Sequence, residues 1–319
     1  MRRFSPELQQ ALALANAGRA PEAALIVQRR VAAGDADALF VMADFKWSGV
    51  LPQDPAVGRE LYEQAGVAGV REAAQFATNL MANGVAGPRD WPGALERLER
   101  EAKVDPARRK AHELIGRMKL DAAGDPAVLP VGQVLSISPM VTKFERLFTA
   151  AECDYLRDVA EPGYQPSTVY NAQRQLVRDP MRGSDGATLH WLIEDPAIHA
   201  LNRRLAAASG SAAEHGEALQ ILRYRPGQQY KPHFDFVRAA DNQRRLTALV
   251  YLNHDYDGGE TGFVKTGLKV KGRKGDAIVF ANSLADRSVD PMSEHAGLPV
   301  KKGTKYLASR WIREAKWHP

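Results

Sequence analysis

The chain has 319 residues, 45% of them hydrophobic and 25% charged, which is the composition of a globular protein long enough for two domains. Its 43 basic and 38 acidic residues give a formal charge of +5, an excess too small and too scattered to indicate a nucleic-acid-binding protein. No apolar run approaches the roughly 18 residues of a membrane-spanning helix, so we expect no membrane contact.

The cysteine content and the first residues favour a reducing compartment. Cys153 is the single cysteine, which excludes an intrachain disulfide and gives no sign of a thiolate zinc site. The chain begins with basic residues and a small-residue stretch, but Pro6, Glu7, Gln9 and Gln10 interrupt the apolar segment that a signal peptide needs. We therefore expect no export and a cytoplasmic location.

Residues 5–120 are predicted to be helical, because they are rich in Ala, Leu, Glu and Arg and their apolar positions recur at intervals of three and four. These residues also repeat themselves with a period near 36, which is the signature of stacked helix pairs. The recurring positions are Asp54, Gly58 and Tyr62, which return 36 residues later as Asp90, Ala94 and Leu98.

This first part of the chain resembles tetratricopeptide-like repeats of the Sel-like kind. The resemblance implies an α-helical repeat domain, or α-solenoid, at residues 1–120. Most of its aromatic side chains are expected to be core, and a sharper hypothesis is that one or two of them face a concave groove that binds a peptide. The aromatic residues in question are Phe40, Trp47, Tyr62, Phe76 and Trp91.

A linker is predicted at residues 121–135, where Gly, Pro and Asp break the helical period. A helix is expected at 149–160, with Thr149 as its N-cap and Glu152 as the partner in a capping box. Short runs rich in Val, Ile, Leu, Tyr and Phe then predict the strands of an all-β core. The clearest of these runs are 219–224, 246–252, 276–281 and 305–312.

A candidate metal site stands among these strands. In His233-Phe234-Asp235 the first and third side chains would point to the same face of a strand, while Phe234 faces the opposite way. His295 follows two further predicted strands and could return to the same place. Two imidazoles and one carboxylate on one face of an octahedron are typical of non-haem Fe(II) oxygenases.

Two further residues strengthen this interpretation. Lys305 lies ten residues after His295 and should face inward if it alternates with Leu307. A buried ammonium is costly unless it is paired, and the distal carboxylate of 2-oxoglutarate would supply the pair. Tyr224, on the strand before His233, could donate a phenolic hydrogen bond to the same carboxylate.

The order and spacing of several motifs resemble the catalytic domain of prolyl 4-hydroxylases. The resemblance begins at FTAAECDYLRDVAEPGYQPSTV (148–169), is closest in LQILRYRPGQQYKPHFDF (219–236), and continues through LTALVYLN, GGETGF, KGDAIVFAN, HAGLPVKKGTKY and ASRWI to about residue 313. It implies a double-stranded β-helix, or jelly roll, as the catalytic domain at residues 136–319. The whole chain would then be an α+β protein with two domains.

The resemblance also implies the roles of individual residues. The matching positions are His233, Asp235 and His295 for Fe(II), Lys305 and Tyr224 for 2-oxoglutarate, and Tyr230, Trp311 and Arg182 for the substrate. One motif departs from the family, which often has Arg-Thr-Ser where this chain has Arg182-Gly183-Ser184.

The implied activity is that of a 2-oxoglutarate-dependent dioxygenase similar to procollagen-proline 4-dioxygenase. Such an enzyme consumes O2 and 2-oxoglutarate, hydroxylates a C–H bond and releases succinate and CO2. The resemblance extends to L-ascorbic acid as an additional reductant. The expected partner is a peptide or protein substrate, which the helical repeats would recruit.

Other functions stay open at this point. The same chemistry could act on another residue or on a small molecule. A cupin-like module could hold a metal without turnover, although such a module has no need of Lys305. An adaptor with helical repeats and a vestigial β-domain is the third alternative, and the intact His233, Asp235 and His295 argue against it.

Overall fold

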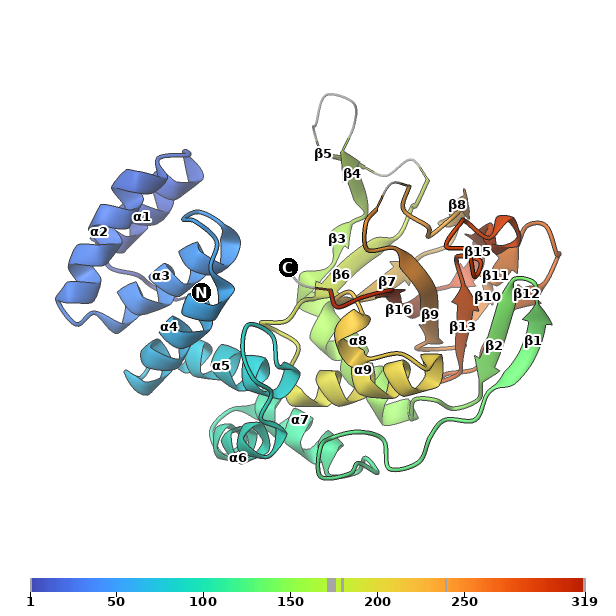
Figure 1. Cartoon of the computed structure of the whole chain (residues 1–319), viewed down its shortest axis with the longest axis horizontal. Helices are drawn as coiled ribbons and strands as arrows, with labels where there is room; N and C mark the ends of the chain where they lie inside the picture. Colours follow the sequence, from blue (N-terminus) through green and yellow to red (C-terminus); the bar gives the residue numbers. More distant parts are fainter. Residues whose placement is uncertain (1, 171–175, 179–180, 239, 318–319) are drawn as a thin grey trace. The chain divides into compact units, whose positions relative to one another are not determined.

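The structure is a computed structural model that describes residues 2–170, 176–178, 181–238 and 240–317 (Figure 1). It divides into two compact units. The first contains Met1–His112 and Trp191–Pro196, and the second contains Glu113–His190 and Ala197–Pro319. The first unit thus ends a few residues before the boundary predicted at 120, and it includes a short segment from the middle of the sequence.

The predicted helical character of the N-terminal part is confirmed. The helices are α1 (Pro6–Asn16), α2 (Ala20–Ala32), α3 (Ala36–Ser48), α4 (Pro55–Val67), α5 (Arg71–Asn83), α6 (Trp91–Ala102) and α7 (Pro106–Ile115). Within the described ranges, none of the helices is both long and apolar enough to cross a membrane.

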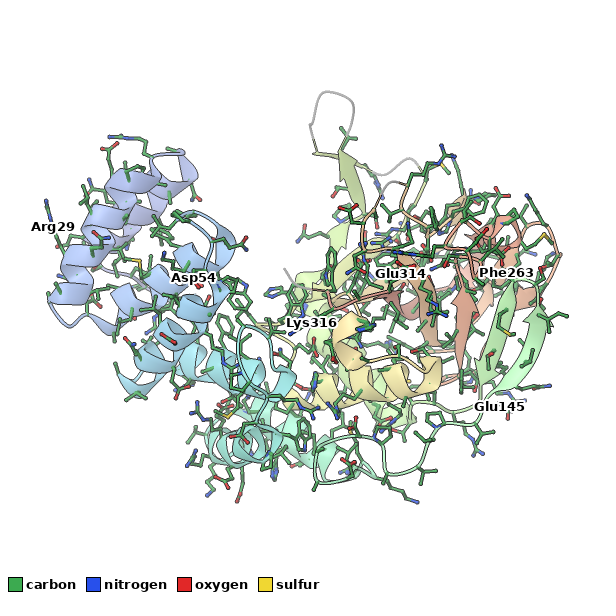
Figure 2. All side chains as sticks on the ribbon, viewed as in Figure 1. Arg29, Asp54, Glu145, Phe263, Glu314 and Lys316 are labelled. Atoms are coloured by element: carbon green, nitrogen blue, oxygen red, sulfur yellow. The ribbon has the colours of Figure 1, made fainter. Side chains whose placement is uncertain are left out.

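The positions that repeat in the sequence do the same work in successive helix pairs. The carboxylates of Asp54 (Figure 2) and Asp90 cap α4 and α6 by accepting from backbone N–H groups in the first turn. Gly49 and Gly84 end α3 and α5 in the left-handed conformation. The period near 36 therefore reports shared helix caps. That the repeats are of the tetratricopeptide-like class stays a prediction.

The aromatic core of the first unit includes the segment from the middle of the chain. Leu192 is buried in one cluster with Phe40 and Tyr62. The side-chain amides of Asn79 and Asn83, both on α5, donate to the backbone carbonyls of Leu192 and Trp191 at 2.7 and 3.0 Å. These polar contacts fix the segment, so the first unit needs residues that lie over a hundred positions after α5.

The second unit contains the strands, and every described strand pair is antiparallel. The large sheet has the order β1 (Gln133–Ile137), β2 (Met140–Phe144), β13 (Ala277–Ala281), β9 (Arg244–Tyr251), β16 (Lys305–Arg313), β7 (Leu219–Tyr224), β6 (Asp185–Leu189) and β3 (Gln165–Pro166). The smaller sheet has the order β12 (Lys269–Val270), β11 (Thr261–Phe263), β14 (His295–Gly297) and β8 (Tyr230–His233). Two further pairs are β10 (Tyr256–Gly258) with β15 (Val300–Gly303), and β4 (Thr168–Tyr170) with β5 (Leu176–Arg178).

The two sheets share one apolar core, which gives the jelly-roll layout predicted for this domain. Phe263 of the smaller sheet (Figure 2) meets Phe280 of the large sheet edge to face, with ring centroids 5.2 Å apart. The four predicted strands correspond to β7, β9, β13 and β16. Strand β1 begins inside the predicted linker. The sequence analysis missed this strand because its mostly exposed residues show little apolar alternation.

Two helices lie beside the large sheet (Figure 1). Helix α8 (Ala150–Ala160) begins with the predicted capping box, in which Thr149 and Glu152 exchange hydrogen bonds. Helix α9 (Pro196–Ser209) was not predicted. Its Arg204 forms an ion pair of 2.7 Å with Glu152, which joins the two helices. Arg310 of β16 donates to a backbone carbonyl of α9 and so ties that helix to the sheet.

Asp44 in the first unit gives a pH-dependent contribution to stability. Burial raises the pKa of Asp44 from 3.8 to about 6, although the Tyr62 hydroxyl donates to it. The folded unit therefore binds the Asp44 proton more tightly than the unfolded chain does, and stability is lost as the pH rises between about 4 and 6. We expect Asp44→Asn, which keeps the acceptor for Tyr62, to raise the melting temperature at pH 8 and to leave it unchanged below pH 4.

Circular dichroism melts of both proteins across this pH range check the expectation. Tyr62→Phe is the matched control, since it leaves the buried carboxylate without its donor and should lower the melting temperature at pH 8. A lower melting temperature for Asp44→Asn at pH 8 would contradict the account.

Candidate metal centre and pocket

Three side chains from the smaller sheet and its loops converge. His233 ends β8 and faces His295 of β14 as its partner in the ladder. The two Nε2 atoms lie 3.7 and 3.6 Å from the carboxylate oxygens of Asp235. One potential ligand atom from each of the three residues lies within 4.8 Å of the others. The structure therefore brings together the cluster that the sequence singled out.

The local geometry differs from the expectation in one respect. We expected His233 and Asp235 on one face of a strand, but β8 ends at His233 and Asp235 lies in the loop that follows. Strand β8 is an edge strand that contains Pro232, which cannot donate to a ladder. Phe234 is 39% exposed. Asp235 consequently owes its position to side-chain contacts and not to strand pairing.

Both histidines are held in the form that a metal requires. Nδ1 of His233 lies 2.8 Å from the carbonyl of Lys231, and Nδ1 of His295 lies 3.0 Å from the carbonyl of Ser293. Because a carbonyl can only accept, each Nδ1 carries the hydrogen and each Nε2 offers its lone pair toward Asp235. Burial, with the nearby His295, lowers the pKa of His233 to about 4, so this imidazole is neutral at neutral pH. Two imidazole Nε2 atoms and one carboxylate form the donor set that fits Fe(II).

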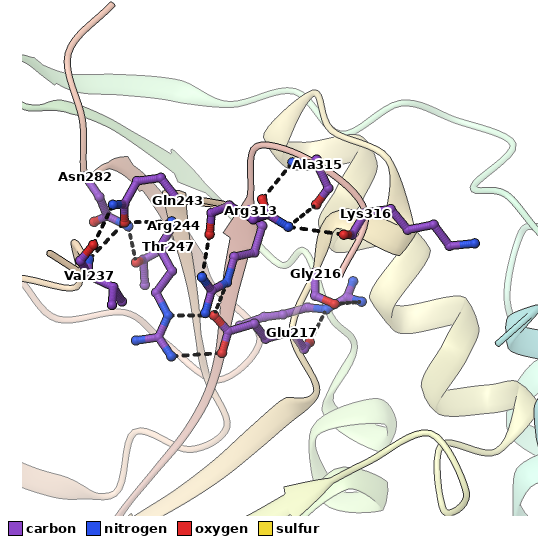
Figure 3. Close-up of polar contacts among 12 residues, drawn as sticks. Gly216, Glu217, Val237, Gln243, Arg244, Thr247, Asn282, Arg313, Ala315 and Lys316 are labelled. Atoms are coloured by element: carbon purple, nitrogen blue, oxygen red, sulfur yellow. Dashed lines mark hydrogen bonds and ion pairs between the residues drawn. The ribbon is translucent and has the colours of Figure 1, made fainter. Parts of the chain in front are cut away.

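Asp235 is 6% exposed and is supported by a chain of hydrogen bonds. Thr247 of β9 donates to its Oδ2 at 2.7 Å. Asn282 in turn donates to the Thr247 hydroxyl at 2.9 Å (Figure 3). Burial alone would raise the pKa of Asp235, but the two histidines and Thr247 hold it below its ordinary value. Sequence reasoning missed Thr247 and Asn282, whose contacts with the site depend on the tertiary fold.

Lys305 lies on the large sheet and is 2% exposed. Its Nζ donates to the carbonyl of Gly259 at 2.7 Å, and its ladder partner is Tyr224, which is also buried. Burial lowers the pKa of Lys305 to about 8. An ammonium in such surroundings is stabilised by an anion, as the sequence argument required.

The remaining predicted residues lie at the same pocket. The Tyr230 ring stacks on His233 with centroids 3.4 Å apart, and the Arg182 guanidinium lies 5.3 Å from the Tyr230 ring. Arg182 also donates to the Ser167 hydroxyl at 3.1 Å. Trp311 is 7% exposed. Its position near the C-terminal end of β16 places the indole beside Asp235.

All eight residues predicted from the sequence line this one pocket: Arg182, Tyr224, Tyr230, His233, Asp235, His295, Lys305 and Trp311. The lining residues that the sequence analysis did not name are Leu222, Leu249, Thr261, Gly297, Leu307 and Ser309. Alternation along β16 could have found two of them, because Leu307 and Ser309 lie on the same face as Lys305 and Trp311.

Comparison with known proteins places this pocket in a described sequence family. Residues 219–313 match the 2OG-Fe(II) oxygenase superfamily. Prolyl 4-hydroxylase 1 of Arabidopsis thaliana is 36% identical over 214 residues, which span 60% of this chain and 76% of that protein. The probable prolyl 4-hydroxylase 3 of the same plant is 32% identical over 209 residues, which span 58% of this chain and 73% of the relative.

A solved structure is also similar to the chain. The viral collagen prolyl hydroxylase from Paramecium Bursaria Chlorella virus-1, in its 2OG complex, is 30% identical with a TM-score of 0.43. The match covers 55% of this chain and 96% of that chain.

Removing one imidazole should remove the metal. We expect His295→Ala to abolish Fe(II) binding, because two remaining donors cannot complete the facial set. Isothermal titration under anaerobic conditions measures the binding, and circular dichroism checks that the fold survives. If His295→Ala bound Fe(II) as tightly as the unsubstituted protein, the assignment of the metal centre would be wrong.

Lys305→Ala should weaken 2-oxoglutarate binding about ten- to a hundredfold, the range that corresponds to losing one charge-assisted hydrogen bond. Iron affinity should hardly change. The pH dependence gives a more specific test. Because the Lys305 ammonium is present below its pKa of about 8 and lost above it, 2-oxoglutarate affinity should fall as the pH rises past 8.

Lys305→Arg is the matched control, since a guanidinium stays charged throughout this range. Its 2-oxoglutarate affinity should show no decline up to pH 9. An unchanged affinity in Lys305→Ala at pH 7 would place the co-substrate elsewhere.

Proposed function

Because the chain belongs to the prolyl 4-hydroxylase family of 2OG-Fe(II) oxygenases, we propose that it hydroxylates prolyl residues in a peptide or protein. The chain is a dioxygenase that uses Fe(II), 2-oxoglutarate and O2. The observation that carries the proposal is that one pocket contains both a three-donor metal cluster and the buried cation of Lys305.

Each side chain has a definite task in this reaction. His233, Asp235 and His295 hold the iron, while Lys305 and Tyr224 bind the distal carboxylate of 2-oxoglutarate. When bound, the iron supplies the oxidative decarboxylation of 2-oxoglutarate to succinate and CO2 and the transfer of one oxygen atom to a C–H bond. The apolar walls of the pocket, which are Leu222, Leu249 and Leu307, exclude water from this chemistry.

The choice of a prolyl substrate is supported by the residues around the metal cluster. Tyr230 offers a ring beside His233 that can pack against a pyrrolidine, and Arg182 offers donors for a peptide carbonyl. The relatives are named as prolyl 4-hydroxylases. The glycine at position 183 is the residue at which this chain departs from the family motif.

We further propose that the helical unit recruits the substrate. Its aromatic cluster leaves Trp47 and Phe76 only partly buried beside the fully buried Tyr62, so both retain surface for a ligand. A tethered binding site raises the local concentration of a bound peptide at the iron. A cytoplasmic location, which suits the free thiol of Cys153, and use of ascorbate belong to the same proposal.

The direct test of the proposed reaction is succinate release. The protein, loaded with Fe(II) and supplied with 2-oxoglutarate, should release succinate when offered proline-containing peptides, and mass spectrometry should find one added oxygen atom on proline. Matched peptides with alanine in place of proline should stay unmodified. Oxidation of another residue or of a small molecule, with proline untouched, would replace the prolyl proposal.

Recruitment predicts a separate effect in the helical unit. We expect Trp47→Ala to raise the KM for a long substrate severalfold and to leave the KM for a short peptide unchanged, because a short peptide does not use the second site. Leu25→Ala, an exposed position on α2, is the control and should change neither constant. Equal KM values for Trp47→Ala and the unsubstituted protein on long substrates would argue against recruitment.

A further inference from the structure

Asp235 depends on residues of the large sheet for its position. It lies in a loop, and its carboxylate is reached from β9 by Thr247 and from β16 by Trp311. Thr247 and Trp311 are direct partners in the ladder between these two strands. The two side chains therefore form one platform beneath the carboxylate.

Trp311 is the less constrained half of this platform. Thr247 makes a hydrogen bond of good geometry to Asp235. The indole N–H of Trp311 is buried and meets no acceptor at such geometry within the described chain, although its closeness to Asp235 favours the carboxylate form. The orientation of this indole must accordingly come from what packs on its ring.

Arg244 packs on that ring. Its guanidinium carbon lies 3.8 Å from the centroid of the Trp311 ring system, within the range of a cation–π contact. Glu217 holds the guanidinium in place with two parallel hydrogen bonds of 2.6 and 2.8 Å. Glu217 is in turn fixed to the same tryptophan, because its backbone N–H donates to the Trp311 carbonyl at 2.8 Å.

Glu217 also separates two like charges. Arg244 and Arg313 face each other across the β9 and β16 ladder, and Glu217 lies between them, accepting a 2.7 Å bond from Arg313 as well (Figure 3). Directly opposed like charges destabilise a sheet, so this carboxylate is needed to keep Arg244 where it is. All three side chains are at most one-fifth exposed.

We infer that Glu217 and Arg244 are positioning residues, which orient the Trp311 indole and through it the Asp235 carboxylate for metal binding. They touch neither the metal cluster nor the pocket, since neither residue is among those that line it. The inference rests on Asp235 as an iron ligand in the proposed function, and it does not depend on which substrate is hydroxylated.

The chain offers a matched control in Arg313. This arginine shares Glu217 with Arg244, but its guanidinium covers the ring of Trp317 at 4.2 Å, away from Trp311. Arg244→Gln and Arg313→Gln remove the same charge from the same carboxylate. Arg244→Gln uncovers the Trp311 indole, whereas Arg313→Gln uncovers Trp317 and also removes a hydrogen bond to the Asn242 carbonyl.

The test measures Mn(II) binding by electron paramagnetic resonance, without 2-oxoglutarate or substrate, alongside melting temperature. Supporting contacts behind a metal ligand are typically worth ten- to a hundredfold in affinity, so we expect Arg244→Gln to raise the Mn(II) Kd at least about tenfold. Arg313→Gln should raise it less than about twofold, even if both variants melt at a similar, lowered temperature.

Arg244→Lys keeps a cation over the ring and should retain most of the Mn(II) affinity. This variant also provides a test if Arg244→Gln does not fold. The effects of Arg244→Gln and Trp311→Phe should not add in the double variant, because both act through one indole. Equal Kd values for the Arg244 and Arg313 variants, or additive effects in the double variant, would overturn the inference. Failure of the unsubstituted protein to bind Mn(II) would instead overturn the metal centre itself.

Discussion

The burial of the Asp235 carboxylate is the constraint on which the catalytic unit depends. A charge shielded from water is costly unless partners surround it. Here His233 and His295 approach from the smaller sheet, Thr247 approaches from the large sheet, and a metal ion would complete the set. The two sheets must therefore face each other at a fixed separation. The apolar core between the sheets supplies most of the free energy of folding, and the polar cluster around Asp235 sets the relative position of the two sheets.

The same requirement explains the arrangement of the central strands β7, β16 and β9. Their register sets Lys305 opposite Tyr224 at one end and Trp311 opposite Thr247 at the other. Because β16 places alternate residues on one face, its two ends serve two binding tasks, the co-substrate at Lys305 and the metal ligand at Trp311. The backbone of β16 therefore sets the distance between the iron site and the co-substrate site, and side-chain substitutions hardly change that distance.

The sequence predicted what local patterns can encode. Alternation found β7 and β16, the capping box found α8, and the repeat in the first unit reflected caps at Asp54 and Asp90. The sequence did not place Asp235 in a loop, because His233, Phe234 and Asp235 continue the alternation of a strand although β8 ends at His233. Contacts between distant segments were equally invisible, such as the burial of Leu192 among helices of the first unit and the pairing of Glu217 with Arg244.

The central claim is that one pocket holds Fe(II) and, beside it, 2-oxoglutarate anchored at Lys305. Anaerobic titration of the Fe(II)-loaded protein with 2-oxoglutarate tests it most directly, because chelation of Fe(II) by the co-substrate produces a visible charge-transfer absorption. We expect this absorption to saturate at one 2-oxoglutarate per chain and to develop without any added prolyl substrate. A protein that binds Fe(II) but never develops the absorption would contradict the central claim.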